Sequence, residues 1–327
     1  MKITSIILIV TIVSLSGCEP MAGIMEPAKE KVVLTVDFQQ GKTLRYKFLT
    51  GRDITIALGS TENPSQARKT TDKSSESLEI IMAYKPIEID PFGFSKIEAK
   101  CESVKVTRSR RSQRDAVENL GGETFTLTVG PTGKIEDYSS LDALLKEIGE
   151  KAFQADTSRG RIKNPDMISD FVATQWFLWD SIAGIEEPSD GIAIGQTWKS
   201  KLSIPTPMVM RKAREVTYKL DEIRESETGR LAVITGTYQP ADSVPQSWPI
   251  PYSGKFQMTG PFGFYRNYRI QSLKGSGEEL FNIDSGLTEQ YNQQYTIEMK
   301  ASLLLPLAGA EPRITIDQTI TMTLLKD

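Results

Sequence analysis

The stretch Thr124-Phe-Thr-Leu-Thr-Val-Gly-Pro-Thr-Gly-Lys-Ile135 decides the fold class. Its first half alternates threonine with large apolar residues, which is the period-two pattern of a β-strand with one buried face. The Gly-Pro-Thr-Gly at residues 130–133 then predicts a tight turn, because glycine accepts positive φ angles and proline presets the turn. The stretch therefore predicts an antiparallel hairpin.

The same alternation extends in both directions along the chain. It recurs upstream at Leu44, Tyr46 and Phe48 and at Leu78, Ile80 and Met82. At the far end, residues 314–324 alternate isoleucine, methionine and leucine with threonine and aspartate. These segments predict further strands in half-buried antiparallel sheets.

Two segments between the β-patterned regions have helical periodicity instead. After Ser139 or Ser140 as the cap, apolar residues from Leu141 to Phe153 follow a 3.6-residue stripe. Asn164-Pro165 then gives a cap and a first-turn proline for a second stripe that reaches Ile182. We expect this helix pair to lie against a sheet.

The two β regions share turn motifs at a similar spacing. Gly41-Lys-Thr-Leu44 resembles Gly195-Gln-Thr-Trp198, and Gly133 and Gly286 are separated by nearly the same number of residues. Pro91-Phe-Gly-Phe94 recurs as Pro261-Phe-Gly-Phe264 at a different spacing, so it corresponds only if a segment was inserted. The pattern predicts an internal duplication.

The predicted fold class is α+β and β-rich, with two related antiparallel β halves joined by a central pair of helices. Whether the halves share one curved, half-barrel-like sheet is left open, as is whether they form one domain or two. The boundaries follow the composition: a signal peptide at 1–17, a lipidated tether at 18–31, the first β half at 32–138, the helical pair at 139–189 and the second β half at 190–327.

The N-terminal segment predicts export and lipidation. Lys2 precedes an apolar run, Ile3 to Leu15, which is shorter than the roughly 20 residues that span a bilayer. The run ends in Leu15-Ser-Gly-Cys18, which resembles the lipobox of bacterial lipoproteins. The resemblance implies that Cys18 is diacylated and becomes the new N-terminus, which suffices for a stable membrane anchor. By resemblance to enterobacterial sorting, the absence of aspartate at position 19, which is Glu19, permits transfer, so we favour the outer membrane facing the periplasm over the inner membrane.

Composition limits the chemistry of the folded part. The chain has no histidine, so Ser-His-Asp and Cys-His catalysis and imidazole metal sites are excluded. With 39 Lys and Arg against 42 Asp and Glu, the net charge of −3 gives no support to nucleic-acid binding. Once Cys18 is lipidated, Cys101 has no intramolecular partner, and its place in an alternating apolar pattern predicts a buried, inert thiol. We predict no cofactor, no metal site and no catalytic residues.

Several motifs together resemble those of a family of bacterial lipoproteins. The Gly-Lys-Thr strand opening, the hairpin at 124–135, the mid-chain helices, Gly-Gln-Thr-Trp at 195–198 and Phe-Asn-Ile-Asp-Ser-Gly-Leu at 281–287 look like an uncharacterised family of bacterial lipoproteins. This resemblance covers roughly residues 33–325 and implies no known activity. At the level of a curved sheet with helices on its concave side, the predicted fold is similar to the lipoprotein carriers LolA and LolB.

Two groups of residues suggest binding. The cationic run Arg108, Arg110, Arg111 and Arg114 either meets anionic headgroups or polysaccharide, or is a solvated loop, which we favour. Aromatic residues concentrate in 238–268 among prolines that place some rings on loops. We expect these rings and the helices to border one apolar recess for a ligand, although a packed core is the favoured alternative. The candidate residues of this recess are Phe171, Trp176, Trp179, Trp248, Tyr252 and Phe262.

The sequence therefore predicts a non-catalytic envelope lipoprotein. Its expected partners are a membrane, through the lipid on Cys18, and a protein partner or apolar ligand. The alternative function is a carrier of lipid or another apolar molecule in a recess of a curved β-sheet.

Overall fold

A computed structural model describes residues 31–59, 70–109, 114–157, 160–245, 248–303 and 311–326. The predicted signal peptide, Cys18 and nearly all of the tether lie outside the described residues, as do Arg110 and Arg111. Among the helices within these ranges, none is long and apolar enough to cross a membrane.

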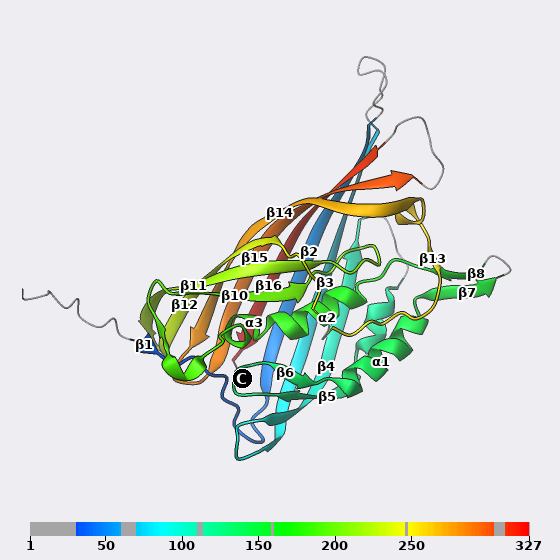
Figure 1. The fold of residues 1–327 in the computed structure, drawn as a ribbon. Helices are drawn as coiled ribbons and strands as arrows, with labels where there is room; N and C mark the ends of the chain where they lie inside the picture. The colour runs from blue at the N-terminus through cyan, green and yellow to red at the C-terminus, as the bar shows by residue number, and fades with distance from the viewer. Residues whose placement is uncertain are drawn as a thin grey trace, which may run out of the picture.

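One antiparallel sheet of eleven strands organises the molecule (Figure 1). In spatial order its strands are β10 (Thr197–Ser203), β11 (Ala213–Ser226), β12 (Gly229–Pro240), β14 (Tyr265–Asn282), β15 (Leu287–Leu303), β16 (Glu311–Leu325), β2 (Leu44–Gly59), β3 (Thr70–Ile89), β4 (Ser95–Arg108), β5 (Thr124–Val129) and β6 (Ile135–Asp137). Both β regions are thus simple meanders, and they join where β16 pairs with β2. The predicted β-rich α+β class is confirmed, and the two halves share one sheet.

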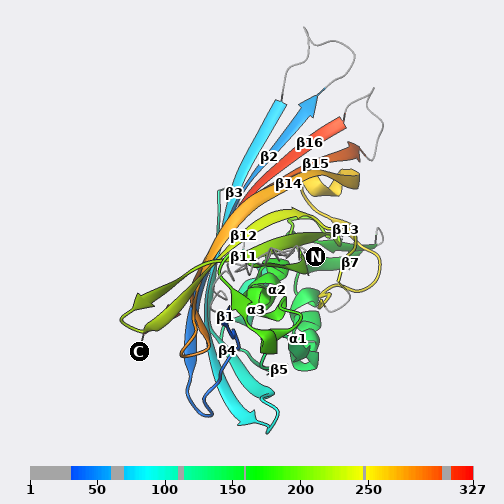
Figure 2. The same cartoon turned by 60° about the vertical axis from the view of Figure 1, so that its left-hand side comes forward.

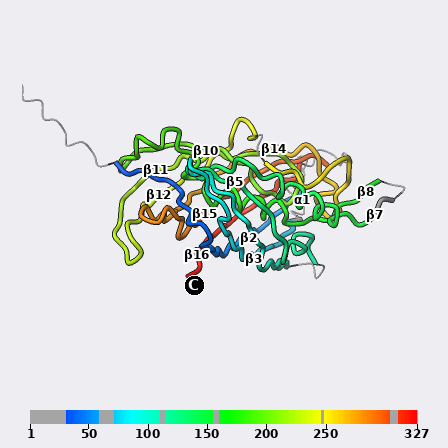
Figure 3. The backbone as a smooth tube through the Cα atoms, turned by 90° about the horizontal axis from the view of Figure 1, so that it is seen from below, coloured from blue at the N-terminus to red at the C-terminus, as the bar shows by residue number. Residues whose placement is uncertain are grey.

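The helices fill the concave face of this curved sheet (Figures 1 and 2). They are α1 (Ser139–Glu150), α2 (Ile168–Phe177) and α3 (Asp180–Ala183), with short 3₁₀ helices at Ala116–Leu120, Pro188–Asp190 and Pro261–Gly263. A second small sheet joins β7 (Phe153–Thr157), β8 (Gly160–Lys163) and β13 (Gln257–Met258), and β1 (Lys31–Val32) pairs with β9 (Ile192–Ala193). In the view from below, α1, β7 and β8 lie toward one end of the molecule (Figure 3).

The predicted helix pair is only partly right. The first stripe ends with α1 at Glu150, and Phe153 begins β7 instead. The second stripe starts at Ile168, after Asn164-Pro165, and breaks before α3. At the break, Trp179 has a φ of −125° and packs edge-on against Phe38 and Tyr84. Almost every residue of α2 is buried, which is typical of a helix covered on all sides.

The turn motifs of the two halves occupy matching places. Gly41 precedes β2 and Gly195 precedes β10, while Gly133 and Gly286 end the β5–β6 and β14–β15 turns. Gly133 has a φ of +78°, and a Cβ there would lie 2.8 Å from Trp179 Cβ. Gly286 has a φ of +66°, and a Cβ would lie 2.5 Å from the Asp37 amide nitrogen. Glycine is therefore required at both turns, and the duplication itself stays a prediction.

The Pro-Phe-Gly-Phe repeat does not follow this correspondence. Residues 91–94 turn the chain from β3 into β4, whereas residues 261–264 form a 3₁₀ helix and its cap before β14. These two places are not equivalent in the meanders. The repeated motif therefore reflects the preference of proline and glycine for turns and does not mark corresponding positions of the two halves.

Candidate functional site

A row of polar side chains crosses the concave face beneath α2. Arg52 on β2 lies opposite Glu76 on β3, which in turn lies opposite Arg108 on β4. The Arg52 Nη2 and Glu76 Oε2 atoms are 2.6 Å apart, and Arg108 Nε donates to Glu76 Oε1 at 2.8 Å. In the other direction the register continues from Arg52 to Gln318 and then to Tyr295.

Carboxylates from outside the sheet complete this row. Arg52 Nη1 donates to Asp170 of α2 at 2.9 Å, and Gln318 Nε2 donates to the same carboxylate at 3.2 Å. Arg108 also pairs with Asp115, which caps the 3₁₀ helix Ala116–Leu120. Although burial favours the neutral acid, Arg52 and Arg108 lower the pKa of Glu76 to about 2. Burial raises the pKa of Asp170 in spite of its contact with Arg52.

A second buried arginine stands at the other end of α2. The Arg214 guanidinium lies between two aromatic rings, with its carbon 4.2 Å from the Phe177 centroid and 4.6 Å from that of Tyr238. Its Nη2 atom is 3.8 Å from Asp180 Oδ2, and the same carboxylate oxygen accepts a hydrogen bond from Tyr218 at 2.7 Å. Acids on α2 and α3 are therefore matched to arginines on the sheet at both ends.

Two cavities share Arg108 and Pro165 in their linings. The larger of these two, about 180 Å³, is here called the Phe262 recess. Apolar side chains of β2 (Ile54 and Ile56) and of the covering segments (Pro165, Pro261 and Phe262) line it, together with polar side chains of β3 and β4, including Ser74 and the Glu76–Arg108 pair. The recess therefore combines apolar side chains with three charged ones, Asp72, Glu76 and Arg108, of which the last two form an ion pair.

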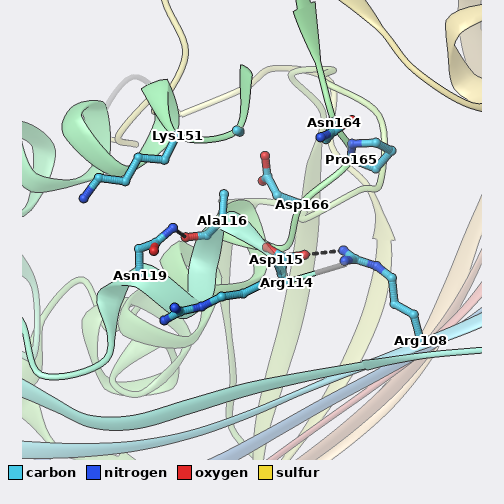
Figure 4. A pocket seen from close by; sticks show the side chains of 10 residues that line it. Arg108, Arg114, Asp115, Ala116, Asn119, Lys151, Asn164, Pro165 and Asp166 are labelled. Carbon is cyan, nitrogen blue, oxygen red and sulfur yellow. Dashed lines mark hydrogen bonds and ion pairs between the residues drawn. The ribbon is translucent and has the colours of Figure 1, made fainter. Parts of the chain in front are cut away.

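The smaller cavity, about 110 Å³, is here called the Arg108 cavity (Figure 4). Its lining is mostly polar and charged and comprises Arg108, Arg114, Asp115, Ala116, Asn119, Lys151, Ala152, Asn164, Pro165 and Asp166. Asp166 is held by Lys163, whose Nζ lies 2.5 Å from its Oδ2. Figure 4 shows Arg108 on one side of Asp115 and Asp166, with Arg114, Asn119 and Lys151 on the other.

The six predicted recess residues divide between the core and separate cavities. Phe171 is fully buried against Phe125, and Trp179 is 3% exposed against Phe38 and Tyr84, so both belong to the packed core.

The remaining four lie nearer the surface. Trp176 contacts Trp248, with ring centroids 5.5 Å apart. Trp248 and Tyr252 line a cavity of about 60 Å³, and the Tyr252 hydroxyl donates to Asp166. Phe262 lines the separate recess that bears its name. A ligand site at Phe262 therefore has different neighbours from those predicted.

Sequence reasoning placed Arg108 in a solvated loop, and this is wrong. Its side chain is 8% exposed, because β4 continues to Arg108 and turns it inward between Glu76 and Asp115. Sequence reasoning also missed Arg52, Glu76 and Asp170. The sequence does contain an indication for Arg52. In the alternating pattern of β2, Arg52 falls on the same inward face as Phe48 and Ile54, so a buried arginine could be expected there.

Two further predictions concern reactive groups. Cys101 is buried at 1% exposure, as predicted, and burial raises the pKa of its thiol to about 12. In the part of the chain that the structure describes, no three acidic, cysteine or histidine side chains gather as a metal site.

Comparisons with known proteins give no family. No protein-family model and no curated protein matches the chain. Among solved structures, one of lipid–protein interactions in lipovitellin is similar over 89% of this chain and 26% of that chain, with 10% identity and a TM-score of 0.41. The open-gate secretin of the Salmonella SPI-1 type III secretion injectisome is similar over 87% of this chain and 60% of that one, with 8% identity and a TM-score of 0.14. Likeness at these scores establishes neither family nor ligand, and the resemblance to a lipoprotein family stays a prediction.

Proposed function

We propose that this chain is a non-catalytic protein of the bacterial cell envelope, held at a membrane by a lipid on Cys18, that binds an apolar or amphipathic ligand in the Phe262 recess. The observation that supports this function is the recess itself, which combines apolar side chains of β2 and of the covering segments with polar side chains of β3 and β4. Ligand sites are commonly concave and apolar with a few fixed polar groups.

The walls favour an apolar group. Ile54 and Ile56 of β2 line the recess, and Phe262 lines it from a different part of the chain. Each methylene that leaves water for such a surface contributes about 0.8 kcal/mol, so four contribute about 3 kcal/mol, or roughly a hundredfold in affinity.

The charges of the recess favour binding over catalysis. A general acid needs a pKa near the working pH, whereas the pKa of Glu76 is lowered to about 2, after the opposing effect of burial, by Arg52 and Arg108. Arg108 is in turn paired with Glu76 and Asp115. These groups orient a ligand and do not exchange protons with it.

A polarity-sensitive dye tests this site. We expect N-phenyl-1-naphthylamine to fluoresce more strongly with the wild-type protein, and Ser74→Phe to abolish the increase, because Ser74 lines the recess opposite Ile54 on the neighbouring strand. Ser77→Phe is the matched control, since Ser77 lies on the same strand and points to the other face. Equal dye binding by wild type and Ser74→Phe would contradict the proposal.

A protein partner is the second candidate. The turn between β3 and β4 presents Phe92 at 80% exposure and Phe94 at 38%. Exposed aromatic residues close together are typical of contact surfaces. Loss of a partner after Phe92→Ser and Phe94→Ser, with dye binding unchanged, would favour this surface over the recess.

A further inference from the structure

We propose that the Arg108 cavity binds a phosphate group, either as the free ion or as the headgroup of a lipid. The site is distinct from the Phe262 recess, although the two share Arg108 and Pro165 in their walls. It therefore stands or falls independently of the proposed apolar site.

The charged side chains at the cavity form two groups: buried ones that pair with each other, and exposed cationic ones, Arg114 and Lys151. In the inner wall, Arg108 is paired with Asp115, and Asp166 with Lys163. Neither acid is exposed beyond 6%. Because these acids already have cationic partners, their repulsion of an incoming anion is reduced.

Arg114 and Lys151 form the exposed cationic group. Arg114 Nη2 donates to the backbone carbonyl of Glu118 at 3.2 Å, a neutral acceptor that leaves the guanidinium charge uncompensated by this contact. Lys151 follows the last residue of α1, its Nζ lies 3.4 Å from Glu147 of that helix, and both side chains are well exposed. Exposed pairs of this kind contribute little, so an anion competes readily for the lysine.

The remaining lining suits an oxyanion. Asn119 lies on the same side of the cavity as Arg114 and Lys151 (Figure 4), and its Nδ2 donates one hydrogen bond to the Ala116 carbonyl at 3.0 Å, which leaves its second N–H for a ligand. Asn164 accepts hydrogen bonds from Gln154 and Thr259 at its Oδ1 atom, and this arrangement fixes its amide orientation and leaves Nδ2 as a donor. Arginine and lysine are the usual phosphate-binding side chains. The volume of about 110 Å³ is several times that needed by one water molecule, which leaves room for a phosphate group.

The shared wall of the two cavities suggests how a lipid with a phosphate headgroup would bind. With its phosphate among Arg114, Lys151 and Asn119, its apolar chain would pass the shared wall of Arg108 and Pro165 toward Phe262. Free phosphate would occupy the cavity alone.

Calorimetric titration of the protein with inorganic phosphate and with dihexanoyl phosphatidic acid tests the proposal. We expect Arg114→Gln with Lys151→Gln to weaken binding of whichever probe binds by about tenfold. Lys146→Gln is the matched control, because Lys146 is an exposed lysine of α1 that does not line the cavity. Unchanged melting temperatures would show that the exposed substitutions leave the fold intact.

The two probes distinguish the sources of the phosphate. Equal affinities indicate a site for the free ion. Tighter binding of the lipid, with the gain removed by Ser74→Phe, indicates a headgroup site whose chain enters the recess. The proposal is overturned if neither probe binds, or if the double variant binds both as well as wild type does. The dye experiment tests the Phe262 recess and the titrations test the Arg108 cavity, so failure of one proposal does not imply failure of the other.

Discussion

Glu279 makes the stability of this fold depend on pH in a range where no histidine titrates. Its carboxyl group is 2% exposed on β14 and accepts a hydrogen bond from Thr288 Oγ1 at 2.7 Å. Among the described residues, no lysine or arginine forms an ion pair with it. Burial raises its pKa from 4.5 to about 7. We therefore expect Glu279→Gln to remove a pH-dependent loss of stability.

The sign and size of the effect follow from the two pKa values. Below pH 4.5 the folded and unfolded states both hold the proton, so the group has no effect. Between pH 4.5 and 7 the unfolded state releases the proton first, and stability falls as pH rises. The difference of pKa values corresponds to about 3 kcal/mol, which is fully lost above pH 7. Glutamine resembles the protonated acid in shape and keeps an acceptor for Thr288.

Urea denaturation from pH 5 to 8 measures this difference. We expect Glu279→Gln to be more stable than wild type by only about 0.8 kcal/mol at pH 5 and by about 3 kcal/mol at pH 8, the latter being roughly 6 °C in melting temperature. Burial also raises the pKa values of Asp115, Asp170 and Asp180, but these acids are the same in both proteins, so the difference between the two pH profiles reports on Glu279. Glu278→Gln, an exposed neighbour on the same strand, should keep the wild-type slope. Parallel pH profiles for wild type and Glu279→Gln would refute the reasoning.

Three further predictions concern the anchor, the thiol and the buried ion pairs. Cys18→Ser should abolish labelling by a radioactive fatty acid, because only the thiol accepts the diacylglyceryl group, and a labelled variant would contradict lipidation. Cys101 should react with a thiol reagent only after unfolding, because burial raises its pKa to about 12, and rapid labelling of the folded protein would contradict this. Asp170→Ala should cost about 3–5 kcal/mol in urea denaturation, whereas Arg52→Met with Asp170→Leu should recover only part of it, because Arg52→Met also removes one of the two arginine partners of Glu76. Additive losses in the double variant would show that the pair is not coupled.

Local patterns predicted the strands because each strand has one buried and one exposed face. Residues 314–324 alternate in the structure as they do in the sequence, and the turn at residues 130–133 joins two strands as expected. Cys101 was also placed correctly, since its neighbours Ala99 and Ile97 share its inward face. In each of these cases, the residues that predict the local structure are close neighbours in the sequence.

The site could not be predicted in this way, because its residues meet through long-range packing. Arg52 and Asp170 lie on different elements, and nothing in the sequence around either residue indicates that the other is its partner. Phe171 and Trp179 have the composition of a ligand wall, yet α2 is covered on all sides and leaves them in the core. Arg108 was misplaced for the same reason, since its partner Glu76 comes from the preceding strand.

The buried polar row has a consequence for both cavities. Arg52 holds Asp170 on α2, while Arg214 lies near Asp180 on α3, so the helical segment is fixed at two points. Sliding the helical segment by one turn, 5.4 Å, would separate Asp170 and Asp180 from their arginines at a cost of several kcal/mol each, whereas Arg52 would keep Glu76 as a partner. Pro165 lies just before α2 and forms the wall that the two cavities share. The ion pairs that specify the position of the helix therefore also specify where the Phe262 recess ends and the Arg108 cavity begins.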